Sequence, residues 1–347
     1  MADRAMARDV QVLVTGATGF IGQAVVARLR RAGYQTRGLV RTTSDTGALE
    51  REYPEVALRY GDLGDHASLV TAMEGCDWVL NCAGLNSFWE LDASAYRRIN
   101  VEGTQNLMLA ALEAEVAKVV HVSTVMAYGF PDESPFREES APGPHKSAYA
   151  SSKYRGDQIA WELHKTRGLP LVVVYLAAVV GAGDPKPVMQ IARFLEGRVP
   201  AMIDSDSQFT YVYIGDAAEA IVRAAEKPDN VGERYLVGNQ RLTTAEYFQT
   251  VSDLSGVAMP RRTIGRRTSL ALARLMAAWS ELTGTPPAMP PDLMRTAFAR
   301  SLLFDGGKAE QELGLEYTPS RLALAEAVEE IRRRQAARAD GTAPATD

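Results

Sequence analysis

The sequence predicts an α/β protein built on a doubly wound parallel sheet. Two observations predict this class. Short apolar runs alternate with helical segments over residues 10–176, and a glycine-rich turn separates the first run from the first helix. After residue 181 the alternation stops, and proline and glycine accumulate. A smaller, mostly helical C-terminal lobe is therefore expected beyond that point.

The elements follow from the spacing of apolar residues. Continuous runs of Val, Leu and Ile predict strands that are buried on both faces, as in a parallel sheet. Apolar residues spaced three and four apart predict the intervening helices. The expected strands are residues 10–14, 36–40, 58–60, 78–82, 118–122 and 171–176, the expected helices are 19–31, 66–73, 93–114 and 146–166, and a strand-like aromatic run follows at 209–214.

These elements suggest domain boundaries. Residues 9–180 are expected to form the sheet domain, with 207–238 returning to it, and 181–206 and 239–335 are expected to form the lobe. The lobe should cover the carboxyl ends of the strands and leave a cleft for a small-molecule substrate. Residues 336–347 are rich in Ala, Thr and Asp and are expected to be a disordered tail.

The bulk composition excludes several classes of function. The net charge is −5, so a basic nucleic-acid footprint is not expected. No apolar run approaches the ~18 residues of a membrane span. The first strand, near Val10, leaves no room for a signal peptide. Cys76 and Cys82 show neither disulfide nor metal-site spacing. A cytoplasmic protein without a metal is expected.

One later stretch, residues 270–279, has apolar residues at helical spacing. The pattern predicts an amphipathic helix whose apolar face packs on the core. A membrane surface or a partner protein is the alternative for that face.

The glycine-rich turn, TGATGFIG at residues 15–22, carries the first functional prediction. Its glycines permit a tight turn, approach of a pyrophosphate to the backbone, and close packing of the following helix. The helix N-terminus offers N–H donors to phosphate oxygens. This pattern predicts a Rossmann-type site for a nicotinamide dinucleotide, with contacts from Gly16, Thr18, Gly19, Phe20 and Ile21 and with Gly22 at the helix packing.

Arg41 follows the second strand, where the usual fingerprint has an acidic residue for the ribose 2′-hydroxyl. A carboxylate repels a 2′-phosphate, whereas a guanidinium can bind it through paired hydrogen bonds. The sequence therefore favours NADP(H). NAD(H) is the alternative if Arg41 faces solvent or stacks on the adenine.

Tyr149 and Lys153 are four apart on an expected helix, so they share a face. A nearby ammonium and the cationic nicotinamide ring favour the phenolate and lower the tyrosine pKa. Tyr149 can then exchange a proton with a substrate carbonyl or alcohol during hydride transfer. Ser123 and Thr124 end the fifth strand, where a hydroxyl can orient the carbonyl. Asn100 can hold a water behind Lys153 or satisfy local backbone.

Further motifs are spread along the chain, and together with the glycine turn they resemble the extended short-chain dehydrogenase/reductase family over residues 10–331. They include GDL (61–63), NCAG (81–84), HVSTVMAYG (121–129), YASSK (149–153), FTYVYIGDAAEA (209–220) and LLFDGGKAEQELG (302–314). LVRTTSD (39–45), the Phe88-Trp89 segment and GERYLVGNQRLT (232–243) are similar to dihydroflavonol-reductase-like and hopanoid-associated epimerase-like members.

The resemblance implies roles by position. It implies a catalytic triad with one assisting residue, two adenine contacts, and a coenzyme groove. These positions are Thr124, Tyr149 and Lys153 for the triad, Asn100 beside it, Asp62 and Leu63 at the adenine, and Cys82, Ala83, Gly84 and Ser123 in the groove. Tyr175-Leu176 departs from the Arg-Pro or Asn-Pro pair that members usually carry near the nicotinamide.

Three functions are open. The first is an oxidoreductase acting on a carbonyl or secondary alcohol of a small, fairly apolar molecule. The second is a nucleotide-sugar epimerase with tightly bound NAD, and the third is a non-catalytic dinucleotide binder. The residues expected to line the substrate cleft are Leu85, Phe88, Trp89, Met126, Val179 and Met189.

A homodimer is also possible. Members of the family often pair the two helices at 93–114 and 146–167 into a four-helix bundle. The apolar residues that allow such pairing can equally pack on the sheet, so both arrangements are open. These residues are Leu107, Ala110, Ala111, Ala114, Ile159 and Leu163.

Overall fold

A computed structural model describes residues 9–90, 92–183, 185–203 and 206–339. Its centre is a seven-stranded sheet in which every pairing is parallel. The predicted doubly wound parallel sheet is confirmed. The strands follow the order β10 (Arg234–Val237), β6 (Leu171–Leu176), β5 (Lys118–Thr124), β4 (Trp78–Asn81), β1 (Gln11–Thr15), β2 (Gln35–Val40) and β3 (Ala57–Tyr60).

The strand order places the glycine turn at a crevice. From β1 the chain runs outward to β2 and β3, then returns to β4 on the other side of β1. Connections leave β1 and β4 in opposite directions, so a crevice opens at their carboxyl ends. The central strands are apolar because helices cover both faces of the sheet, and every residue of β6 is buried.

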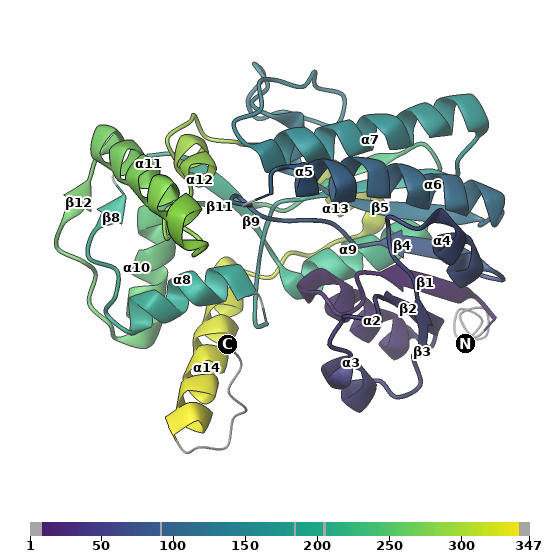
Figure 1. Cartoon of the computed structure of the whole chain (residues 1–347), viewed down its shortest axis with the longest axis horizontal. Helices are drawn as coiled ribbons and strands as arrows, with labels where there is room; N and C mark the ends of the chain where they lie inside the picture. The colour runs from purple at the N-terminus through teal and green to yellow at the C-terminus, as the bar shows by residue number, and fades with distance from the viewer. Residues whose placement is uncertain (1–8, 91, 184, 204–205, 340–347) are drawn as a thin grey trace.

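Helices cover the two faces of the sheet in separate layers (Figure 1). On one face, α2 (Phe20–Ala32) packs against α9 (Ile214–Glu226), with the short α3 (Gly47–Glu52) nearby. On the other face, α6 (Gly103–Glu113) lies between α4 (His66–Met73) and α7 (Ala148–Arg167). Leu107, Ala110 and Ala111 are fully buried in the core of this single chain. These three side chains pack toward the sheet and are not available to a partner helix.

The helix expected at residues 93–114 is interrupted. It consists of α5 (Ser94–Tyr96), a π-helical segment η1 (Arg97–Glu102), and α6. Gly156 of α7 packs on this segment so closely that a Cβ there would overlap the Asn100 carbonyl oxygen. π-Helical turns are rare and occur mostly at functional sites. The bulge places the Asn100 side chain between α7 and the sheet.

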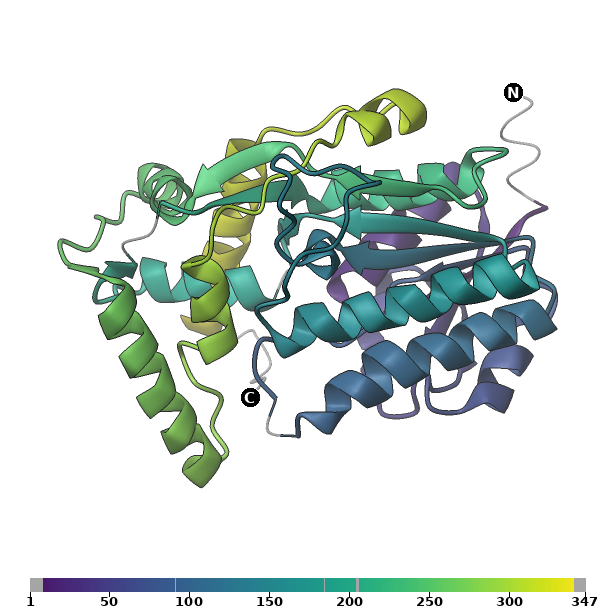
Figure 2. The same ribbon diagram turned by 90° about the horizontal axis from the view of Figure 1, so that it is seen from above.

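The C-terminal lobe has its own apolar core and lies beside the sheet domain (Figure 2). Its helices and its two small sheets are linked to the main sheet through short strands. The elements are β7 (Ala178–Val180), β9 (Gln208–Tyr213) and β11 (Gln240–Thr243) in one sheet, β8 (Met202–Ile203) and β12 (Thr263–Ile264) in another, and α8 (Pro185–Leu195), α10 (Thr244–Ser255), α11 (Arg266–Thr283), α12 (Pro291–Ala297) and α14 (Ser320–Ala339).

The packing assigns the segments after residue 206 to the sheet domain or to the lobe in more detail than the expected boundaries do. Residues 214–237 return to the sheet domain as α9 and β10, whereas β9 pairs within the three-stranded sheet. Leu302, Phe304 and Leu313 belong to the larger core, together with α13 (Gly307–Leu313). Helix α14 continues to Ala339, past the expected start of the tail, and residues 340–347 lie outside the described part.

Helix α11 contains the amphipathic stretch 270–279, and its packing differs from the prediction. Only Ser269, Ala273, Ala277 and Ser280 are buried, all small residues. Leu275 and Trp279 are 69% and 66% exposed, so the prediction that the apolar face packs on the core is wrong for these two side chains. Among the helices of the described residues, none combines the length and apolar character needed to cross a bilayer.

Candidate active site

The glycine turn is held by backbone contacts that leave no room for side chains. Gly16 has φ of +63°, and a Cβ there would lie 3.0 Å from backbone atoms of Ala83. The Gly19 N–H donates to the Gly16 carbonyl at 2.9 Å, and a Cβ at Gly22 would overlap that same carbonyl. Gly19 is the N-cap of α2 and has no side chain to occupy the helix N-terminus. This arrangement fits a dinucleotide pyrophosphate.

Arg41 and Asp62 follow adjacent strands at the same edge of the sheet as the turn. Arg41 is exposed after β2, its backbone N–H donates to the Ser44 hydroxyl at 3.1 Å, and its guanidinium forms no hydrogen bond or ion pair with another described residue. The Asp62 carboxylate accepts the Gly64 N–H at 2.7 Å. Leu63 is anchored through its carbonyl, which accepts a hydrogen bond from the Asn106 side chain at 2.8 Å. These positions suit an adenosine moiety.

The segment Cys82, Ala83 and Gly84 lies between the glycine turn and α7. The Ala83 N–H donates to the Thr15 hydroxyl at 3.1 Å. A Cβ at Gly84 would lie 3.4 Å from Asn100 Oδ1 and 3.9 Å from Lys153 Nζ. Burial raises the pKa of Cys82 to about 12, so its thiol is neutral. The segment is therefore closely packed between the glycine turn and α7.

Tyr149 lies in the first turn of α7, directly beside the end of β5. Ser147 caps the helix by accepting the Ala150 N–H at 3.1 Å, which fixes this first turn. The Tyr149 phenol lies close enough to the Thr124 hydroxyl for that group to lower its pKa. The Phe88 ring lies edge-on to it, with ring centroids 5.9 Å apart. The structure thus brings together three residues that the sequence proposed for catalysis and substrate contact.

The charge environment of Tyr149 differs from the expectation. Burial raises the pKa of the Tyr149 phenol, the hydrogen bond from Thr124 opposes the rise, and the Asp157 carboxylate adds to it. Burial also lowers the pKa of Lys153, against the attraction of Asp157 and Cys82. The Lys153 ammonium donates to the Val122 carbonyl at 3.1 Å. In the chain alone, loss of solvation outweighs the favourable contact with Thr124, whereas the lowered pKa was expected for Tyr149 beside a bound cationic nicotinamide.

Asn100 is committed to structural hydrogen bonds. Its Oδ1 accepts the Leu85 N–H at 2.8 Å, and its Nδ2 donates to the Leu85 carbonyl at 3.0 Å and to the Ser152 hydroxyl at 2.9 Å. The side chain is 2% exposed. The sequence left two roles open for Asn100, holding a water behind Lys153 or forming hydrogen bonds with local backbone groups. The described contacts match the second role. Asn100 holds the segment after β4 against α7. Its partner on α7 is Ser152, the residue before Lys153.

A buried polar network runs beneath the site and was not predicted. Thr15 donates to Asn81 Oδ1 at 2.7 Å, and Asn81 Nδ2 donates to His121 Nδ1 at 2.9 Å. His121 Nε2 then donates to Asp157 Oδ1 at 3.1 Å, and Ser123 donates to Asp157 Oδ2 at 2.7 Å. Burial lowers the pKa of His121, so the ring is neutral. The spacing of Lys153 and Asp157, four apart on one helix face, was the sequence signal for this network.

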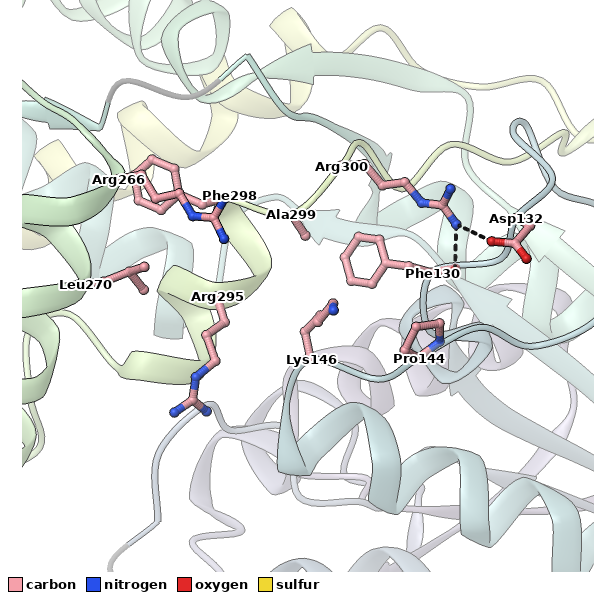
Figure 3. Close-up of a pocket in the computed structure, with 10 residues that line it drawn as sticks. All are labelled: Phe130, Asp132, Pro144, Lys146, Arg266, Leu270, Arg295, Phe298, Ala299 and Arg300. Atoms are coloured by element: carbon pink, nitrogen blue, oxygen red, sulfur yellow. Dashed lines mark hydrogen bonds and ion pairs between the residues drawn. The ribbon is translucent and has the colours of Figure 1, made fainter.

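A pocket of about 600 Å³ lies where the lobe meets the start of α7 (Figure 3). Lys146, three residues before Tyr149, lines it, and Asp292 of α12 accepts the Ala148 N–H at 2.9 Å. Aromatic and cationic side chains face the space together. The lining consists of Phe130, Asp132, Pro144, Lys146, Arg266, Leu270, Arg295, Phe298, Ala299 and Arg300.

The residues expected to line the substrate cleft do not line this pocket. Phe88 lies against Tyr149, and the Met126 N–H donates to the Thr124 hydroxyl at 3.3 Å. The Trp89 indole N–H is buried and makes no hydrogen bond within the described residues. Val179 lies in β7, and the Met189 side chain falls outside the described residues. Sequence reasoning missed the lining residues because they come from three distant segments with no shared motif.

Comparisons with known proteins agree with the fold. The model of the NAD dependent epimerase/dehydratase family matches residues 12–238. The chain is 30% identical to a protein named as a dihydroflavonol 4-reductase from Synechocystis sp., covering 91% of this chain and 92% of that protein. It is 32% identical to sterol demethylase protein B from Methylococcus capsulatus, covering 93% and 98%. The crystal structure of gox2253 has a TM-score of 0.80 and 31% identity, covering 94% and 98%.

The matched range extends from the first strand through β10, the last strand of the main sheet. It includes the glycine turn and the Tyr149-Lys153 helix. The resemblance inferred from the motifs is confirmed by this match and by relatives that span nearly the whole chain. The chain belongs to the NAD dependent epimerase/dehydratase family.

Proposed function

We propose that the chain is an NADP(H)-dependent reductase for the carbonyl group of a small molecule with an apolar body and an anionic group. The observation that carries this proposal is the buried Tyr149 phenol. It lies beside the Thr124 hydroxyl and three residues after Lys146, which lines the pocket. The proposed proton donor and a substrate-sized cavity are therefore close in the chain, and Lys146 connects them, although Tyr149 itself is not among the lining residues.

Tyr149 can supply the proton that reduction of a carbonyl needs. Burial raises the pKa of the phenol, so the phenol stays protonated at neutral pH and can give its proton to a carbonyl oxygen. The Thr124 hydroxyl lies beside the phenol, and the Phe88 ring lies edge-on to it. The nicotinamide, when bound, supplies the hydride.

The coenzyme preference is argued from Arg41. Its guanidinium is exposed beside the glycine turn and is not committed to any other described residue. It is therefore free to bind a 2′-phosphate through paired hydrogen bonds. Gly16, Gly19 and the uncapped N-terminus of α2 would hold the pyrophosphate. NAD(H), which lacks the 2′-phosphate, is the alternative.

The substrate class follows from the lining of the pocket. Phe130, Phe298 and Leu270 supply apolar surface for a ring or chain. Lys146 and Arg266 have exposed cationic groups that form no hydrogen bond or ion pair with another described residue, so they suit a carboxylate or phosphate. The relatives named for dihydroflavonol and sterol chemistry support a substrate with an apolar ring system.

The test is a reductase assay with matched pairs of ketones, with and without a carboxylate or phosphate, using NADPH and NADH. We expect NADPH consumption, with higher kcat/KM for the anionic member of each pair. Tyr149→Phe should lower kcat by about 10²–10⁴-fold and leave coenzyme affinity unchanged. Tyr154→Phe, a part-buried tyrosine on the same helix, is the control. Absence of turnover with every ketone and both coenzymes would contradict the proposal.

A second candidate is a nucleotide-sugar epimerase. The observation that favours it is the same cationic lining, since Lys146 and Arg266 suit a sugar-linked diphosphate, whereas Arg295 and Arg300 are paired with Asp292 and Asp132. An epimerase removes a hydride and returns it, so its coenzyme stays bound. Native mass spectrometry separates the two: one non-exchanging NAD⁺ per chain indicates the epimerase, and freely exchanging NADP(H) indicates the reductase.

A further inference from the structure

Helix α11 presents an apolar stripe to solvent. Leu275, Trp279 and Leu282 are 69%, 66% and 82% exposed, and they account for three of the six large hydrophobic side chains exposed in the described residues. With the exposed Ala271 and Ala278 they recur at spacings of three and four, so they lie along one side of the helix. The buried residues of α11 are all small and lie on the opposite side. The stripe is therefore built from side chains that the core does not use.

The surroundings of the stripe are strongly basic. Residues 261–283 contain five arginines and one glutamate, a net charge of +4 in a chain whose net charge is −5. All five arginines are exposed, and among the described residues none of their guanidinium groups forms a hydrogen bond or an ion pair. They are Arg261, Arg262, Arg266, Arg267 and Arg274.

We propose that this face of α11, which we call the α11 stripe (residues 271, 275, 278, 279 and 282 with its flanking arginines), docks on an anionic lipid bilayer. An interfacial helix combines an apolar face with Lys or Arg beside it, and tryptophan is favoured at the headgroup level. Each arginine near an anionic surface contributes about 1 kcal/mol of attraction. The helix would lie in the plane of the membrane and not cross it.

A second copy of the chain fits this surface less well. In a two-fold symmetric contact the same patch faces itself, which would bring Arg267 and Arg274 of the two copies into one contact. Like charges at such a contact are repelled, whereas phosphatidylglycerol headgroups are attracted. The charge of the stripe thus argues for lipid over self-association.

Helix α11 carries the stripe and also reaches the pocket. Arg266 and Leu270, in its first turns, line the 600 Å³ pocket, while Leu275 and Trp279 follow farther along the same helix on its exposed side. Docking itself does not depend on the proposed reduction, and the experiment below measures binding and not turnover.

The experiment is flotation of the full chain with vesicles of phosphatidylcholine alone and of phosphatidylcholine mixed with phosphatidylglycerol. We expect binding to the mixed vesicles that weakens at high salt. Replacing Leu275, Trp279 and Leu282 by serine should weaken binding at least tenfold, because each buries apolar area in the interface. Arg267→Gln with Arg274→Gln should weaken binding to anionic vesicles about 30-fold.

Two control variants lie on α14. Leu322→Ser removes another exposed leucine, and Arg321→Gln with Arg333→Gln removes two exposed arginines, so neither should change flotation. Circular dichroism and coenzyme affinity verify that each variant is folded. Two results would overturn the proposal: equal flotation of the wild-type chain and the α11 variants, or sedimentation showing a dimer that the triple serine variant dissociates. A failed ketone assay with intact flotation would leave the docking standing.

Discussion

Replacing Asp157 tests the buried network beneath the site. Its carboxylate, 3% exposed, accepts hydrogen bonds from His121 at 3.1 Å and from Ser123 at 2.7 Å. A hydrogen bond to a charged group contributes about 1.5–3 kcal/mol, and a buried donor left without a partner costs about 1–3 kcal/mol. Asp157→Ala removes the acceptor of both donors. We expect the free energy of unfolding to fall by about 3–5 kcal/mol.

Asp157→Asn removes the charge of the side chain and keeps its size and shape. The amide can still accept from His121 and donate to Ser123, so the expected loss is about 1–2 kcal/mol. Urea unfolding at neutral pH, followed by tryptophan fluorescence, measures both variants. Asp253→Asn, at an exposed position of α10, is the control and should change stability by less than about 0.5 kcal/mol. The reasoning is refuted if Asp157→Ala is as stable as the control, or if the two Asp157 variants lose equal stability.

Three further predictions follow from the coenzyme turn and the network. Arg41→Gln should lower kcat/KM with NADPH by about 10–100-fold, since only the 2′-phosphate loses a charged partner, and equal losses with NADH would contradict the coenzyme preference. Gly22→Ala should weaken coenzyme binding and lower the free energy of unfolding by at least about 1–3 kcal/mol, because the new Cβ would overlap the Gly16 carbonyl. Gly265→Ala, with open space around its Cβ, is the control. Wild-type coenzyme affinity in Gly22→Ala would argue against the close contact. Burial lowers the pKa of His121, so below pH ~6.5 the unfolded chain binds a proton that the folded chain does not. The stability contributed by the neutral ring is therefore present above that pH and lost as the pH falls. The difference in unfolding free energy between wild type and His121→Gln should shrink by up to about 1.4 kcal/mol per pH unit. A difference that does not change with pH would refute this.

The sequence by itself determined the features that depend on neighbours along the chain. The apolar run 171–176 and the helix at 66–73 have the expected bounds, because strand and helix periodicity are local properties. The constraints on Gly19 and Gly22 were predictable because they arise within the eight residues of the glycine turn, whereas Gly16 is also constrained by the distant backbone of Ala83. The proximity of Tyr149 to the end of β5 follows from the topology of a parallel sheet, in which every carboxyl end lies at one edge.

Only the tertiary structure decided the features that depend on distant segments. The pocket joins Phe130, Arg266 and Phe298, which are far apart in sequence and share no motif. The direction of the Tyr149 pKa shift required its burial, a sum over every surrounding element, whereas the sequence displayed only its lysine neighbour. The same reason explains α11: periodicity showed an apolar side on this helix, but which side meets the protein and which meets solvent was set by the small residues that pack against its neighbours.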